Sequence, residues 1–550
     1  MLFPTIIERR QLKRLRAAAT KKLSHTGIRC LRNGVLNVVT TFAVLSVLSV
    51  PVPMAPSFVF GPAPVMAGEG MWTLNKLDQC PFDKWKAAGL EVDQKGIYNP
   101  KGVDLADAVV QLGGGTASFV SPNGLLLTNH HVAFGALQRQ SSVEINYIED
   151  GFLARTHEEE IPALGYEARV LLDIKDVTKE VMKGVKDKMS DKERYDKTEE
   201  NIKKIVKKAE EGQDVECTVR AFYGGAEYYL YTYFMLKDIR IVYAPPRSIG
   251  VYGGDEDNWM WPRHTGDFSF LRAYVAPDGK TAEYAEENLP YKPKKFLPFS
   301  NAPIKEGDLT MVLGYPGSTR RYRTSYAIDY YVNQMYPQSI ARYQDLLSIL
   351  EDEAARNPEA GIKVASLIQG LNNGLKNNQG MLEGLIKADL LSKKLAEEKA
   401  LREFMESNPD LKKKYGTVLD EIGAQYDTYR TYAELNSIAG WMGYAANAMG
   451  SAYTVYKWSN EHEKKNDLDR DPGFQDRDEP RRKKMLELAD LRYDESSDKR
   501  ILSYFFKKAM ALPEGQQLKS LEPITAGLTG DAKDKAIDDF VESLYAGTKV

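Results

Sequence analysis

Two adjacent histidines, His130 and His131, directly follow the apolar run LLLT (Leu125–Thr128). The chain has only six histidines, so a pair at the end of a strand-like run is unusual enough to suggest a function. An imidazole with an ordinary pKa of about 6.5 takes up and returns a proton near neutral pH. The pair therefore predicts proton-transfer chemistry, with one of the two histidines as a general base.

A general base needs a carboxylate on its other ring nitrogen, which selects the tautomer and stabilises the imidazolium. The segment GGDEDNWMWPRHTGDFSFLRAY (Gly253–Tyr274) offers four acidic residues: Asp255, Glu256, Asp257 and Asp267. Asp267 opens an alternating strand, whereas the other three stand in a Gly-rich loop and are expected to be exposed. Asp267 is therefore the favoured partner. His264 is a rival base, although it lies only three residues before Asp267.

The elements that must position these residues follow from the apolar periodicity. ASFV and LLLT, separated by Ser-Pro-Asn-Gly, predict a hairpin over 117–128. Further strands are expected at 228–236, 240–246 and 267–275, within a strand-like segment that runs from 215 to about 313. A charged amphipathic helix is expected over 175–212, where Val177, Val181, Val185 and Met189 form one stripe. Beyond Arg320 the pattern is helical throughout, so the expected order is β, one charged helix, β and a long α block.

Composition excludes some functions. The first 34 residues contribute a charge of +8 and the remaining chain −11, which provides no basic surface for nucleic acid. No C-x-x-C or H-E-x-x-H spacing occurs, so no dedicated zinc site is expected. A metal-dependent hydrolase using His130, His131 and His264 stays an alternative, but these residues lack a helical ligand spacing.

The N-terminus predicts export. A basic segment is followed by VLNVVTTFAVLSVLSV (35–50), which is shorter than the roughly 20 residues of a spanning helix, and then by Val65-Met66-Ala67. Residues 1–67 are interpreted as a signal peptide, or as an uncleaved N-terminal anchor, which predicts a periplasmic or secreted protein. Beyond it, Cys80 and Cys217 are the only cysteines, and their pairing stays open.

The hairpin that ends in Thr-Asn-His-His resembles the place where trypsin-like serine peptidases hold their base, with His131 as that base. The sequence as a whole, from about Leu77 to its last residue, resembles serine peptidase family S46, the bacterial dipeptidyl-peptidase 7 and 11 group. Five segments carry the resemblance: FVSPNGLLLTNHHVAFGALQRQSS (119–142), DGFLARTHEEEIPA (150–163), GGDEDNWMWPRHTGDFSF (253–270), LGYPGSTRRY (313–322) and NNGLKNNQGM (372–381).

The resemblance implies a mixed β and α fold, namely a chymotrypsin-like double β-barrel with a large inserted α-helical cap domain. Residues 68–320 would belong to the barrels and 321–550 to the cap. It also implies release of dipeptides from the N-termini of oligopeptides, with no cofactor, and a homodimer. Carried over, His131 is the base, Asp267 its orienter, and Asn258, the Trp259 backbone and Asn373 hold the α-amino group of the substrate. One departure is Val132, where many family members have cysteine.

The nucleophile of this mechanism is missing from the sequence. Peptidases of this class place it in Gly-x-Ser-Gly-x-Pro, yet no serine of this chain is followed by glycine. Ser318 in GYPGST is interpreted as a turn residue. The resemblance places the nucleophile beyond the helical insert, so we expect a chain cut short within the cap, with an incomplete second barrel and no activity of its own. The alternative is a non-catalytic periplasmic descendant that binds peptide N-termini.

Overall fold

The computed structural model describes residues 71–317, 320 and 322–547, and the account below concerns the unit that begins at Trp72. The expected signal peptide or anchor (1–67) and Ser318 lie outside the described residues. Among the described helices, none combines the length and the apolar character that crossing a membrane requires.

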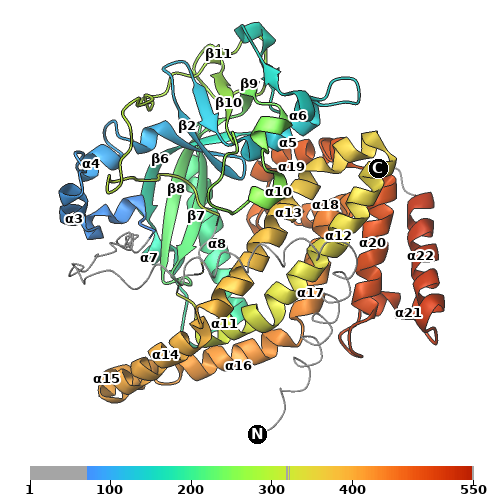
Figure 1. The fold of residues 1–550 in the computed structure, drawn as a ribbon. Coiled ribbons are helices and arrows are strands. Elements are labelled where there is room, and N and C mark those ends of the chain that lie inside the picture. Colours follow the sequence, from blue (N-terminus) through green and yellow to red (C-terminus); the bar gives the residue numbers. More distant parts are fainter. Residues whose placement is uncertain (1–70, 318–319, 321, 548–550) are drawn as a thin grey trace, which may run out of the picture. The chain divides into compact units, whose positions relative to one another are not determined.

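The strands pair into one antiparallel sheet (Figure 1). Its eleven strands are β1 (Val109–Leu112), β2 (Gly115–Phe119), β3 (Leu125–Thr128), β4 (Phe152–Leu153), β5 (Ile161–Pro162), β6 (Ala168–Asp176), β7 (Glu216–Phe222), β8 (Glu227–Leu236), β9 (Asp238–Ala244), β10 (Ser269–Val275) and β11 (Leu289–Pro290). Nine of them follow the order β4-β9-β10-β3-β2-β1-β6-β8-β7, while β11 pairs with β10 and β5 with β9. The strands expected at 228–236, 240–246 and 267–275 are confirmed as β8, β9 and β10.

The hairpin of β2 and β3 is also confirmed, with Phe119 opposite Leu126. Gly124 ends its turn at a φ of +69°, and a Cβ there would lie 2.7 Å from the backbone oxygen of Ala273. Only glycine fits this close approach. The other edge of β3 pairs with β10, so that Thr128 lies opposite Ser269. This register brings the residues after β3 next to those before β10.

The α-helices that precede or connect the strands are α3 (Phe82–Ala87), α4 (Gln94–Ile97), α5 (His130–Gln140), α6 (Tyr147–Asp150), α7 (Thr178–Val181), α8 (Asp191–Glu210), α9 (Arg247–Gly250) and α10 (Gly254–Asp257). The core of this region joins one face of the sheet to the apolar side of α5. Leu126 and Leu271 are fully buried in it, together with Ala133 and Leu137 of α5. Arg272 points to the opposite face of β10, where its guanidinium pairs with the buried Glu160 at 2.9 Å. Packing on the sheet therefore fixes the start of α5.

Two sequence predictions in this region are wrong. The charged helix expected over 175–212 begins only at Asp191, because Lys175 still belongs to β6 and Gly184 takes a φ of +80° between α7 and α8. A capping box of Ser190 and Glu193 starts α8. The strand-like sequence predicted to run to about residue 313 also ends early, because residues 291–317 contain no strand. Val312 is 97% exposed and does not pair with a strand.

The helical region confirms the expected α block. Its helices are α11 (Ser325–Tyr330), α12 (Tyr336–Arg356), α13 (Pro358–Lys387), α14 (Leu390–Glu406), α15 (Pro409–Tyr415), α16 (Val418–Arg430), α17 (Ala433–Ala445), α18 (Asn447–His462), α19 (Glu479–Glu487), α20 (Glu495–Met510), α21 (Glu522–Thr525) and α22 (Gly530–Ala546). The π-helix Tyr331–Met335 joins α11 to α12. The core of this region contains Leu346 and Leu350 of α12 and Phe505 of α20, all fully buried. Helix α13 lies along α12 and also contacts α5 and α10, which links this region to the sheet (Figure 1).

The expected mixed β and α class is confirmed as an antiparallel sheet with a large helical region. Cys80 and Cys217 are free thiols, buried in separate apolar clusters. Their burial raises the pKa of both thiols, which keeps them protonated at neutral pH.

Candidate functional site

His131 and Asp267 meet where the sheet register places them. Asn129 stands between β3 and α5 as the N-cap, and its side-chain amide donates to Asp267 Oδ2 at 3.1 Å. The backbone N–H of His131 donates to Asp267 Oδ1 at 3.0 Å. The His131 ring then contacts Asp267 Oδ2 through Nδ1 at 2.7 Å. One side-chain bond from Asn129 and one backbone bond from His131 therefore fix the carboxylate in place for the imidazole.

The environment of this pair keeps Asp267 ionised. Burial by itself would raise the pKa of Asp267, but hydrogen bonds from the His131 ring, the His131 N–H and Asn129 outweigh it, so that the pKa lies below its ordinary value. The side chain of Asp267 is 16% exposed, whereas that of His131 is 57% exposed. With Nδ1–H donating to the carboxylate, Nε2 is left as a proton acceptor, and it has no hydrogen-bond partner among the described residues.

His130 has a different environment. It is fully buried, and neither ring nitrogen has a hydrogen-bond partner in the described part of the chain. Its ring lies edge-on to Phe134, with centroids 6.0 Å apart, and a Cβ on Gly250 would lie 2.6 Å from it. Burial lowers the pKa of His130, with Asp267 acting against that change. His130 therefore packs as a neutral ring, as expected for the structural neighbour of His131.

This burial predicts pH-dependent stability. The unfolded chain protonates His130 below a pH of about 6.5, whereas the folded chain resists, so the free energy of unfolding falls as pH drops from about 6.5 to the folded pKa. The slope is at most about 1.4 kcal/mol per pH unit. Urea unfolding followed from about pH 7.5 to pH 5 measures it. His130→Leu should remove this slope, whereas His157→Gln, a substitution of an exposed histidine, should keep it. Equal slopes in wild type and His130→Leu would show that burial of neutral His130 is not the cause.

A second group forms where the loop between β9 and β10 reaches α13. Asn258 Nδ2 donates to Asn373 Oδ1 at 3.1 Å, and the indole N–H of Trp259 donates to the backbone oxygen of Asn373 at 3.3 Å. Trp259 takes a φ of +61°, an uncommon conformation for an aromatic residue. The neighbouring residues Asn258 and Trp259 of the loop thus meet Asn373, which lies 115 positions after Asn258 along the chain.

Two basic residues of this group were not found from the sequence. Lys376, one helical turn after Asn373, donates through Nζ to the backbone oxygen of Asp255 at 2.8 Å. Arg263 donates through Nη1 to Asn258 Oδ1 at 3.4 Å. Nothing in the sequence around Lys376 indicates this contact, because it depends on where α13 lies against the loop.

The same loop connects both groups. After Trp259 it returns on itself, since Thr265 Oγ1 donates to the backbone oxygen of Tyr252 at 2.7 Å and Gly266 N donates to that of Ile249 at 2.9 Å. It ends at Asp267. The rival acids in α10 make no contact with His131, and His264 is exposed. In the described residues, His130, His131 and His264 do not form a group of metal ligands.

A carboxylate-oriented imidazole of this kind can act as a general base that takes a proton from a nucleophile. The family model described as Peptidase S46 matches residues 67–550, and the chain belongs to this family.

Similar proteins include Dipeptidyl-peptidase 7 of Porphyromonas endodontalis, 39% identical over 362 residues that make up 66% of this chain and 44% of the relative. The Asp/Glu-specific dipeptidyl-peptidase of Shewanella putrefaciens is 35% identical over 491 residues, 88% of this chain and 64% of the relative. The crystal structure of Porphyromonas endodontalis DPP11 in complex with the dipeptide Arg-Glu matches with a TM-score of 0.68 and 26% identity, covering 87% of this chain and 70% of that chain. Against most of the curated relatives that it matches, the chain spans about half of their length.

Proposed function

We propose that this chain is part of a serine-type dipeptidyl aminopeptidase that releases dipeptides from the N-termini of oligopeptides. The contact of 2.7 Å between His131 Nδ1 and Asp267 Oδ2 is the observation that carries the proposal, together with membership of the family. His131 would take the proton of a serine hydroxyl through Nε2 and later return it to the leaving amine. Asp267 would hold the tautomer and stabilise the imidazolium.

The nucleophile would come from a part of the protein outside these 550 residues, because no serine here is followed by glycine. The chymotrypsin-like double β-barrel belongs to the same proposal, with the described sheet contributing to it. Expression of the complete reading frame, followed by assay of fluorogenic dipeptidyl substrates, tests the activity. Hydrolysis of a free dipeptidyl substrate and not of its N-acetylated form is the expected result. A complete protein that cleaves neither substrate would refute the proposal.

Asn258, Trp259 and Asn373 would limit cleavage to two residues by binding the substrate's α-amino group. Side-chain and backbone oxygens can accept from an ammonium, and hydrogen bonds to charged groups contribute about 1.5–3 kcal/mol. In this arrangement the Asn258–Asn373 bond, which joins the loop to α13, would place the amide oxygens.

We expect Asn373→Ala in the complete protein to raise KM for free dipeptidyl substrates at least about tenfold, because one of these bonds is lost. Asn372→Ala is the matched control, since Asn372 precedes it on α13 and makes no hydrogen bond to the loop among the described residues. Steady-state kinetics of both variants make the comparison. Equal KM values for Asn373→Ala and Asn372→Ala would show that Asn373 does not bind the amino group.

Export and dimerisation complete the proposal. The N-terminal residues 1–67 would act as a signal peptide or anchor, so the mature protein would be periplasmic or secreted and begin at Gly68 after cleavage. The complete protein would be a homodimer. N-terminal sequencing separates the cleaved signal peptide, with Gly68 first, from the uncleaved anchor, with Met1 first. Cell fractionation tests export and light scattering tests dimerisation; recovery in the cytoplasm or a monomeric mass would contradict them.

A further inference from the structure

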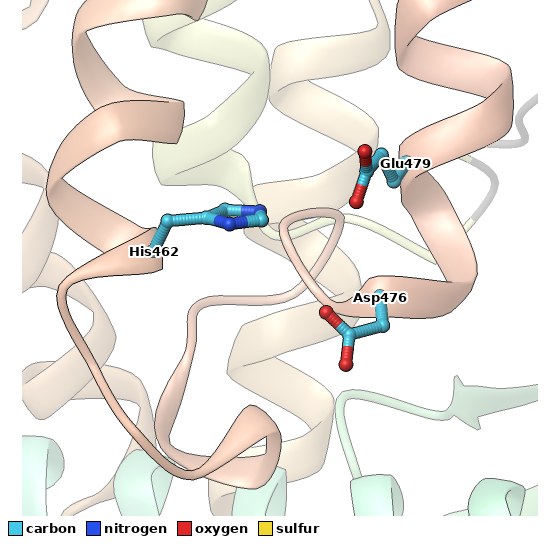
Figure 2. A group of neighbouring side chains, drawn as sticks. All are labelled: His462, Asp476 and Glu479. Carbon is cyan, nitrogen blue, oxygen red and sulfur yellow. The ribbon is translucent and has the colours of Figure 1, made fainter.

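A cluster of side chains with metal-ligand chemistry lies in the helical region, apart from His131 and Asp267. His462 ends α18, Asp476 opens the 3-10 helix Asp476–Asp478, and Glu479 opens α19. One ligand atom of each lies within 4.8 Å of the other two. Figure 2 shows the imidazole and both carboxylates pointing toward a common space.

The imidazole of this cluster is held in place and is available. The His462 ring lies edge-on to Trp458, with centroids 5.7 Å apart and an interplanar angle of 75°. It has no hydrogen bond to any described residue, so both ring nitrogens are free to bind. His462 is also the last residue of α18, where the unpaired carbonyls of the helix end favour a cation.

Each carboxylate keeps one oxygen available. Asp476 pairs with Arg470 through Oδ1, and Glu479 pairs with Lys483 through Oε1 at 2.7 Å. Lys483 also holds the pKa of Glu479 below its ordinary value, so this carboxylate is ionised at neutral pH. The Lys483 side chain is exposed, so its pair with Glu479 contributes little and a divalent cation can compete with it. The Arg470 side chain is largely buried, but its pair with Asp476 occupies only one of the two carboxylate oxygens.

The loop between α18 and α19 contacts the β region. Arg477 pairs with Glu210 of α8 at 2.8 Å and donates to the backbone oxygen of Cys217 in β7 at 3.1 Å. Lys203 of α8 donates to the backbone oxygen of Arg470 at 3.0 Å. Anything that fixes this loop therefore fixes the contact between the helical region and α8 and β7.

We propose that His462, Asp476 and Glu479 form a structural site for a divalent cation of borderline hardness, such as Zn²⁺ or Co²⁺. One imidazole nitrogen and two carboxylate oxygens are ligands that these ions accept, with water completing the coordination. The bound cation ties the end of α18 to the start of α19 and so stabilises the loop on α8 and β7.

Titration of the metal-free, untagged 550-residue chain with Co²⁺ by calorimetry and visible absorption tests the site. We expect one saturable equivalent. His462→Ala and Asp476→Asn should each weaken it at least about tenfold, because the first removes a ligand and the second removes the negative charge of another. Glu463→Gln is the matched control: it neutralises the next residue along, which is exposed and outside the cluster, and should leave affinity unchanged.

Lys483→Met gives an independent test, since it frees Glu479 and removes a competing cation; Co²⁺ should bind more tightly. Zn²⁺ should raise the Tm of wild type and not that of His462→Ala, and circular dichroism confirms that each variant is folded. The proposal is overturned if millimolar Co²⁺ shows no saturable binding. It is equally overturned if folded His462→Ala and Asp476→Asn bind as wild type does.

Discussion

The His131→Ala variant of the complete protein is expected to lose about six orders of magnitude in kcat, because loss of the base in a triad costs about as much as loss of the whole triad. Asp267→Asn should cost about 10⁴-fold, since the amide leaves the geometry intact but selects the wrong tautomer of His131. KM should change little in both variants, because neither residue is assigned to substrate binding. Initial rates with a dipeptidyl substrate, measured with protein at high concentration, resolve the difference.

His264→Ala is the control for this series. His264 is exposed and is the rival base near Asp267, yet it makes no contact with that carboxylate. We expect kcat to stay within about threefold of wild type, as for a surface substitution. A fall of several orders of magnitude in His264→Ala, with His131→Ala near wild type, would exchange the two roles.

The second large effect concerns a polypeptide of these 550 residues. We expect it to hydrolyse dipeptidyl substrates at least about 10⁶-fold more slowly than a longer product of the same gene that carries a Gly-x-Ser-Gly-x-Pro segment, because these 550 residues contain no such segment. Parallel assays of the two purified proteins provide the measurement. Serine-directed inhibitors should label the complete protein and leave the 550-residue chain unlabelled.

Reading the gene past codon 550 in all three frames separates the remaining explanations. A Gly-x-Ser-Gly-x-Pro motif there would support the peptidase proposal. Its serine would be the nucleophile from which His131 takes a proton. If no frame encodes such a motif and the chain still binds dipeptides, a non-catalytic peptide-binding protein is favoured. Dipeptidyl hydrolysis by the 550-residue chain alone would show that another residue acts as nucleophile.

The two wrong predictions about the fold both came from reading local sequence patterns. The stripe from Val177 to Met189 has helical spacing, yet Val177 and Val181 are buried against β7 and β8 while Gly184 interrupts the helix. A periodic pattern does not reveal such a break, because it reports which residues are apolar and not what they pack against. Likewise, the apolar residues near Val312 predicted strands, but residues 291–317 form none and Val312 is exposed.

The sequence by itself determined the elements and the candidate residues whose signals are local. The Ser-Pro-Asn-Gly turn between two apolar runs predicts the hairpin before His131, and the alternating pattern that begins at Asp267 predicts β10. Because the types of His131 and Asp267 and their places beside strands are visible in one dimension, their pairing could be proposed, and the structure places them in contact. Their catalytic roles stay predictions.

Tertiary structure alone decided the contacts between residues far apart in the chain. Asn258 and Asn373 are 115 positions apart, and they meet because α13 packs against the β9–β10 loop. The same packing brings Lys376 to α10, and the turn between α18 and α19 brings His462 to Asp476 and Glu479. The residues that make these contacts show no periodic sequence pattern. The helices are positioned instead by burial of the apolar faces of α12, α13 and α20 in the helical core, which lies elsewhere.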